Sequence, residues 1–343
     1  MSLAALNSPP LVASLGVALS MYGQTVLETS PFFIQHHKWF NLIAYAINTV
    51  AVGIPGRIDG EVAKGIQAEN AATAAGKKKD DDHDEVVASS SSSSAALLPR
   101  TGKTLVAPAG WAFAIWGPIF TGELAFVISQ FFVAAKDNNK QLLASQIQSI
   151  SAPFVIAQLF QTLWCAAFRP KYTGNLMWIS TGMLGGVAYY LSKAHAVFTS
   201  VSRISGGLSW WEYAIHFLPI SLHFGWTTAA TLVNLNGAVA VADMGTSDAL
   251  LSSKGSSTIS NNNVLINVVG HASVVAATAL GVAITFSRQA PVYGGVISWA
   301  LFAVADGMRQ RLASSSSNGN DDNNVGAQRQ LILSTAGAYI SGL

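Results

Sequence analysis

Charged residues are scarce in this 343-residue chain. Lys and Arg number 19 and Asp and Glu 17, so 10% of the residues are charged, against about a quarter in an average soluble domain. Half of the residues are hydrophobic and the mean hydropathy is +0.38, a balance typical of chains that place apolar faces against lipid. The net charge of +2 gives no basic footprint, which excludes nucleic acid as a partner.

Cysteine is almost absent, and so are the common catalytic motifs. Cys165 is the only cysteine, which excludes a disulfide scaffold and a zinc ribbon. The sequence contains no G-x-S-x-G, no P-loop, no G-x-G-x-x-G and no H-E-x-x-H. We therefore expect no catalytic residues, no metal site and no enzymatic activity.

Long hydrophobic runs dominate the rest of the chain. Each reaches or approaches the roughly 20 residues that cross a bilayer as a helix. The pattern predicts an all-α, polytopic membrane bundle of about seven transmembrane helices. The predicted spans cover residues 38–55, 106–135, 147–168, 176–198, 211–241, 264–286 and 292–308.

The spans divide the chain into a predicted series of segments. Residues 1–37 form an N-terminal segment that we expect to be interfacial. Its apolar stretch, 11–22, is short for a span and fits either a surface helix or the core of a weak targeting sequence. A charged, Ser-rich segment has the composition of a disordered loop, and so does a Ser/Asn-rich one. In order, we expect the N-terminal segment 1–37, a first helix over 38–55, a disordered loop over 56–105, a helical core over 106–241, a disordered loop over 242–263, transmembrane helices over 264–312, and a polar loop and tail over 313–343.

The basic residues indicate an orientation. If seven spans cross the membrane, one side holds 6 Lys and Arg, and the side with the long charged loop and the C-terminus holds 13. The positive-inside rule then places that loop and the C-terminus in the cytoplasm or its equivalent. The sequence does not indicate which membrane is spanned.

Ionisable residues within the spans are candidates for function, because a charge inside a membrane is costly. Glu123, His216 and His223 are the main ones. They could carry protons or contact a ligand, or they could be held by neighbouring helices. The two histidines are seven residues apart, so they share a helix face, but about 10 Å of rise separates them, too far for one metal ion. His271 is typical of a buried core histidine, and Asp306 of a local ion pair with a nearby arginine.

The nine tryptophans fall into two groups. Trp39, Trp178, Trp210 and Trp211 lie at span ends, where an interfacial belt accounts for them. Trp116, Trp164, Trp226 and Trp299 lie deeper, where indole rings could form the walls of a pocket for a flat aromatic ligand. The nearby amides Gln158, Gln161, Asn234 and Asn236 would serve such a pocket, or would bond helix to helix.

Three motifs resemble one family. PAGWAFAIWGPIF (108–120) resembles the opening of the first helix of the TspO/peripheral benzodiazepine receptor family, in its longer bacterial-type "tryptophan-rich sensory protein" branch. AQLFQTLWCAAF (157–168) resembles its helix with an amide before a Trp. LPISLHFGWTTAATLVNLNGA (218–238) resembles its last helix, in which Asn follows Trp by eight residues. The resemblance covers roughly residues 38–310.

The resemblance implies a TspO-like five-helix core around a cavity that binds tetrapyrroles, sterol-like lipids or aromatic compounds. It also implies a homodimer. No cofactor is implied beyond a tetrapyrrole as ligand. Because members of the family have been linked to porphyrin breakdown, the resemblance leaves a tetrapyrrole-degrading activity open as an alternative to a non-enzymatic protein. By motif position the cavity would be lined by Trp111, Trp116, Gln161, Trp164, Trp226, Ala230 and Asn234.

Two functions follow as expectations. The first is an integral, multi-pass membrane protein that binds a planar apolar ligand, with the bilayer and that ligand as its partners, in a sensory or regulatory role. The alternative is a transporter of a small amphipathic molecule, in which Glu123, His216 and His223 are the coupling groups.

Overall fold

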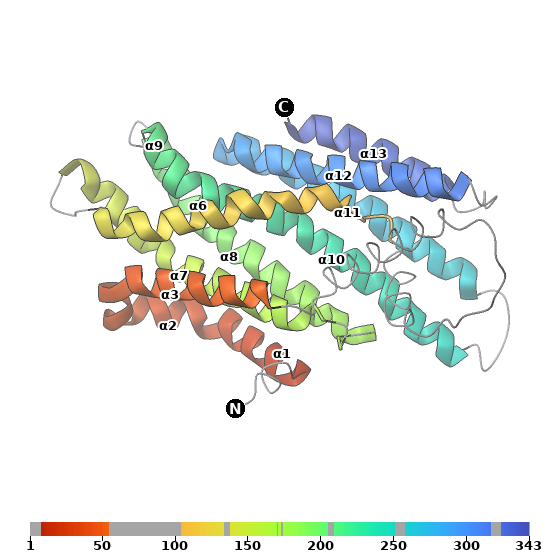
Figure 1. Cartoon of the computed structure of the whole chain (residues 1–343), viewed down its shortest axis with the longest axis horizontal. Coiled ribbons are helices and arrows are strands. Elements are labelled where there is room, and N and C mark those ends of the chain that lie inside the picture. The colour runs from red at the N-terminus through yellow and green to blue at the C-terminus, as the bar shows by residue number, and fades with distance from the viewer. Residues whose placement is uncertain are drawn as a thin grey trace, which may run out of the picture.

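All regular structure in the described part of the chain is helical. The computed structural model describes residues 8–54, 104–133, 138–169, 171–172, 174–204, 209–250, 258–316 and 324–342, and within these ranges it contains helices and no strands. The predicted all-α bundle is therefore confirmed. The helices run roughly along one long axis (Figure 1). The loop expected over residues 56–105 lies almost entirely outside the described residues.

The N-terminal segment is helical and precedes the first predicted span. Three elements form one stretch that is long and apolar enough to cross a membrane, and residues 11–22 belong to this helical stretch. It packs against α7 and α8. The elements are α1 (Pro9–Ala18), the π-helical turn η2 (Leu19–Gly23) and α2 (Gln24–Thr29).

The next helix, α3 (Pro31–Gly53), begins seven residues before the predicted start at Lys38. Its start is fixed by capping, because the Ser30 hydroxyl oxygen accepts a hydrogen bond from the backbone N–H of Phe33 (3.3 Å). Pro31 occupies the first turn, where a missing N–H has no cost.

Most of the remaining elements coincide with the predicted spans and extend several of them. In chain order they are η3 (Gly110–Ile115), α6 (Trp116–Ser129), η4 (Gln130–Phe132), α7 (Asn138–Ala167), η5 (Gly174–Leu176), α8 (Met177–Ile204), α9 (Trp210–Glu212), the π-helical turn η6 (Tyr213–Phe217), α10 (Leu218–Leu250), α11 (Thr258–Arg288), α12 (Pro291–Ser316) and α13 (Asn324–Gly342). Helix thus occupies much of the 242–263 segment that composition predicts to be a loop. Extending a helix that is already packed costs little, so a Ser/Asn-rich sequence can continue it.

The C-terminal tail also differs from expectation, because α13 occupies residues 324–342. This helix packs along α11 and α12 and turns its polar side inward. Gln330 and Ser334 are fully buried, whereas Ile332 and Tyr339 are 67% and 66% exposed. A pattern with polar residues inside does not read as an amphipathic helix of a soluble protein, which is why the sequence suggested a tail.

The same inverted pattern holds for the bundle as a whole. Buried positions include many amides, hydroxyls and histidines, while large apolar side chains such as Phe132 (77% exposed) and Phe286 (72%) face outward. In water such a surface would be unfavourable, whereas in lipid it is the favoured one. Among the described residues, five helical stretches are long and apolar enough to cross a membrane: Pro9–Thr29, Gly110–Phe132, Gln141–Ala167, Val264–Arg288 and Pro291–Ala313. The protein is therefore an integral membrane protein.

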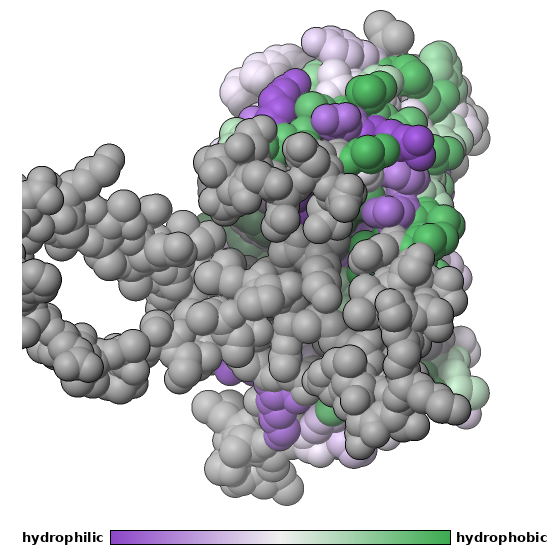
Figure 2. Space-filling model, turned by 90° about the vertical axis from the view of Figure 1, so that its right-hand side faces the viewer, coloured by the Kyte–Doolittle hydropathy of each residue, from purple (hydrophilic) through white to green (hydrophobic). Residues whose placement is uncertain are grey.

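Helix α10 lies at the centre of the arrangement and contacts α6, α8, α11 and α12 (Figure 1). The end of the bundle where α12 finishes and α13 begins is shown in Figure 2. There, hydrophilic and hydrophobic residues are interspersed over the described surface, as expected where a bundle leaves the hydrocarbon layer. Trp39, Trp178, Trp210 and Trp211, which we expect in the interfacial belt, are all exposed.

The contact between α7 and α8 depends on a glycine. A Cβ atom at Gly186 would lie 2.6–2.9 Å from ring atoms of Phe160, whereas one at Gly182, on the same helix, would meet nothing within 4 Å. We expect Gly186→Ala to lower the free energy of unfolding by about 1–3 kcal/mol through overpacking. Thermal unfolding of the detergent-purified protein measures this. Gly182→Ala is the matched control and should be neutral or stabilising; equal effects of the two changes would contradict the packing argument.

Candidate functional site: an aromatic cavity beside a buried acid–histidine pair

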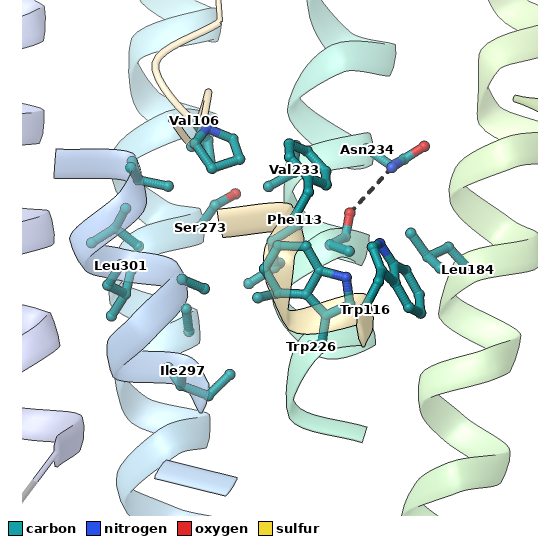
Figure 3. A pocket seen from close by; sticks show the side chains of 18 of the residues that line it. Val106, Phe113, Trp116, Leu184, Trp226, Val233, Asn234, Ser273, Ile297 and Leu301 are labelled. Atoms are coloured by element: carbon teal, nitrogen blue, oxygen red, sulfur yellow. Dashed lines mark hydrogen bonds between the residues drawn. The ribbon is translucent and has the colours of Figure 1, made fainter. Parts of the chain in front are cut away.

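An apolar cavity of about 100 Å³ lies where α10 meets α11, α12 and the segment that leads into α6. Figure 3 shows Trp116, Trp226 and Phe113 gathered on one side of it, with Ile297 and Leu301 of α12 opposite. The lining residues are Val106, Pro108, Phe113, Trp116, Trp164, Phe168, Leu184, Trp226, Ala229, Ala230, Leu232, Val233, Asn234, Ser273, Val274, Ala277, Ile297, Ala300, Leu301 and Val304.

Aromatic rings form the most ordered part of the wall. The Trp116 and Trp226 rings are nearly perpendicular, with centroids 6.2 Å apart, and Phe113 meets Trp226 edge-on at 5.7 Å. Trp164 and Phe168, also in the lining, stack with ring centroids 5.1 Å apart. Edge-on and offset contacts of this kind hold rings in fixed orientations, so the cavity has firm walls suited to a flat apolar group.

The cavity has few polar groups. Asn234 is held in place, because its carbonyl oxygen accepts a hydrogen bond from the Ser180 hydroxyl (2.9 Å) and its amide donates to the carbonyl of Ala230 (3.3 Å). Trp226 is 3% exposed, and its indole N–H has no hydrogen-bond partner among the described residues. That N–H is available to an acceptor on a bound molecule.

One side of the cavity is formed by an extended segment that lies on α12. The backbone N–H of Ala109 donates to the carbonyl of Ala303 (2.8 Å). The contact requires glycine at position 307, since a Cβ atom there would lie 2.1 Å from the carbonyl oxygen of Ala107. This close approach brings Val106 and Pro108 into the cavity wall.

The structure brings together five of the seven residues expected to line the cavity: Trp116, Trp164, Trp226, Ala230 and Asn234. Trp111 lies elsewhere: it is 42% exposed, donates to Asp306 (3.0 Å) and contacts Trp299 edge-on. Gln161 is also outside the lining, because its side chain accepts a hydrogen bond from Asn48 (3.1 Å).

The predicted polar residues Glu123 and His223 meet in the core. His223 Nδ1 lies 2.6 Å from Glu123 Oε1, and both side chains are fully buried. The other carboxylate oxygen accepts a hydrogen bond from the Gln158 amide (3.0 Å), and Gln158 in turn accepts one from Asn48 (2.5 Å). One connected network therefore joins α3, α6, α7 and α10, as buried polar groups in a membrane bundle require.

His216 does not join this pair. Its Nε2 lies 3.1 Å from the Ser129 hydroxyl and its Nδ1 lies 3.1 Å from the carbonyl oxygen of Glu212. It belongs to the π-helical turn η6, an uncommon geometry often found at functional sites. The predicted set of proton carriers is thus split between two levels of the bundle.

Sequence reasoning missed the regularity behind this division. Four helical segments each carry two buried polar residues seven positions apart, which is about 10 Å of rise. The inner layer comprises Asn48, Glu123, Gln158 and His223, and the outer layer comprises Asn41, Gln130, Ser151 and His216. In the outer layer Asn41 donates to Gln130 (2.8 Å) and Ser151 (2.9 Å). The shared spacing of seven could have revealed both layers.

The cavity and the inner layer are neighbours. Trp116 lines the cavity with one side of its ring system and contacts the His223 ring edge-on, with centroids 5.7 Å apart. The His223 Nε2 atom is buried and has no hydrogen-bond partner among the described residues. A single side chain thus separates an aromatic cavity from a buried ionisable pair.

These features define a class of protein, a polytopic α-helical membrane protein with an internal aromatic cavity. The match to a family model is more specific: the model described as TSPO-like protein matches residues 88–312, which is 225 of the 343 residues. The chain belongs to this family, as its three motifs predicted. Neither a comparison with curated proteins nor one with solved structures finds a match.

The buried pair makes a prediction about stability. His223→Phe would leave the Glu123 carboxyl group buried with only Gln158 as a partner, so we expect the free energy of unfolding to fall by about 3–5 kcal/mol. His216→Phe, on the same face and also buried, removes contacts only with a hydroxyl and a carbonyl and should cost about 1–2 kcal/mol. Unfolding in mixed detergent micelles measures both, and equal losses would contradict the special role of the pair.

Proposed function

We propose that this protein binds a planar, largely apolar ligand, such as a tetrapyrrole, a sterol or a similar lipid, in the cavity between Trp116 and Trp226, and acts as a membrane sensor or regulator. The observation that supports this proposal is the aromatic wall, because three tryptophans and two phenylalanines line one cavity. Ligand sites of this kind combine apolar walls with a few placed polar groups, and the Trp226 N–H and the Asn234 amide are such groups. No catalytic role is proposed for any residue.

The ligand must widen the cavity when it binds. A volume of about 100 Å³ is below the roughly 300–1,000 Å³ of sites for drug-sized molecules. The wall that can yield is the extended segment with Val106 and Pro108, because it is not part of a helix. Displacement of this segment would admit a planar molecule while the rings on α10 keep their places.

The first test is quenching of tryptophan fluorescence in the detergent-purified protein, titrated with protoporphyrin IX. We expect saturable quenching in the wild-type protein. In Trp226→Ala the apparent Kd for the porphyrin should rise at least about ten-fold, because the substitution removes part of the wall and the available N–H. Trp39→Phe is the control, since Trp39 is 55% exposed and contacts Phe131 rather than the cavity. Linear quenching that is equal in all three proteins would mean partition into detergent and would refute the proposal.

A second candidate function is a transporter of a small amphipathic molecule, which the fully buried Glu123–His223 pair favours. Ionisable groups in this position serve as coupling groups in transporters. The pair would provide the coupling, and His216 would relay protons at the level of the outer layer.

Transport makes a separate prediction. In proteoliposomes, porphyrin uptake should respond to a pH gradient, and Glu123→Gln should abolish that response because the amide keeps the hydrogen bonds but cannot exchange a proton. Asp306→Asn is the control, because Asp306 bonds to Trp111 and Gln310 outside the inner layer. Uptake that is identical with and without the gradient would exclude coupling.

A further inference from the structure

The charge of the inner layer depends on a single proton. Among the described residues Glu123 is the only fully buried acidic side chain, and its partners are His223 and the neutral amide of Gln158. A carboxylate beside a neutral imidazole leaves one uncompensated negative charge, which is costly in a membrane interior. With one additional proton the pair is neutral overall, whichever of the two side chains holds it.

Within the part of the chain that the structure describes, the groups around the pair offer no other compensation. From α3, Tyr45 donates its hydroxyl to the carbonyl of Phe120 (2.9 Å); η6 brings His216, which bonds to Ser129. From α7 the facing group is the Gln158 amide. From α8, α11 and α12 come His195, Arg288 and Tyr293, and all three face Phe224, the next residue along α10, rather than the pair.

The uncompensated charge would act on the cavity. Trp116 lies between the two, in contact with His223 at 5.7 Å and with Trp226 at 6.2 Å between ring centroids. A molecule in the cavity is then roughly 10 Å from the carboxyl group, where a unit charge at an effective dielectric constant of about 20 changes affinity by about fifteen-fold. The face of a tryptophan ring also attracts cations.

We propose that the Glu123–His223 pair is a proton-binding site and that, once its proton has left, the cavity selects a planar organic cation in its place. The inference rests on the proposed function, because it uses the same cavity. The proton passes to water, and the positive charge of the bound molecule balances the carboxylate. A planar anion in the same cavity binds best when the pair keeps its proton.

The test uses two planar three-ring probes of fixed and opposite charge, 10-methylacridinium and anthracene-2-sulfonate, titrated into the detergent-purified protein. The titrations are made at a series of pH values from about pH 5 to about pH 9, a range that includes the pH at which histidine changes charge in water, while the probes keep their own charges. Across this range we expect the Kd of the cation to fall about fifteen-fold and the Kd of the anion to rise by a similar factor.

Three variants locate the effect. Glu123→Gln should make both Kd values independent of pH, Asp306→Asn should leave the wild-type dependence unchanged, and Trp226→Ala should weaken both probes at every pH. If Glu123→Gln does not fold, the double variant Glu123→Leu/His223→Leu takes its place, because it replaces the whole buried pair by apolar side chains. It should abolish the opposite trends of the two probes.

The outcomes separate this inference from the proposed function. Binding that Trp226→Ala weakens, but that shows the same pH dependence for both probes or none, overturns the proton-for-cation exchange and leaves the ligand cavity standing. Binding that Trp226→Ala does not change overturns both proposals, because the probes then lie outside the cavity. Opposite trends that persist in Glu123→Gln overturn the assignment of the site to this pair.

Discussion

A carboxyl group inside a membrane bundle must find its partners within the protein, and Glu123 finds them on two other helices. His223 of α10 and Gln158 of α7 bond to its two oxygens, and Asn48 extends the network to α3. These bonds fix the register of the four helices, because a shift of one residue along any of them would leave a buried polar group unsatisfied. The position of Trp116 follows from the same register, since it lies two turns before Glu123 on α6.

The wall on the other side of the cavity is built differently. There the wall is an extended segment held to α12 by the bond from Ala109 to Ala303 and by the absence of a side chain at Gly307. One wall thus belongs to a bonded framework of helices and the other to a strip of chain with few bonds. A cavity built in this way can change its volume without disturbing the buried network.

The sequence was sufficient for the class of fold but not for the details of the site. Scarce charge and repeated apolar runs predicted the helical bundle, because lipid imposes that pattern directly. The helix α13 was missed because Gln330 and Ser334 face the protein and Ile332 faces outward. Five cavity residues followed from motif positions, whereas Trp111 and Gln161 were misplaced, since contacts with Asp306 and Asn48 depend on how distant helices align. The pairing of Glu123 with His223, 100 residues apart, depends on the same alignment.

Aromatic rings separate the two polar layers, and this separation affects the rate at which protons could exchange between the layers. Phe126 and Phe154 are fully buried between the layers, with ring centroids 5.2 Å apart. Neither ring can pass a proton along hydrogen bonds, so exchange between the inner layer and the outer layer waits for the rings to move aside. Collective motions of packed helices take microseconds to milliseconds. A proton held at the proposed site would therefore pass between the two layers no faster than these motions.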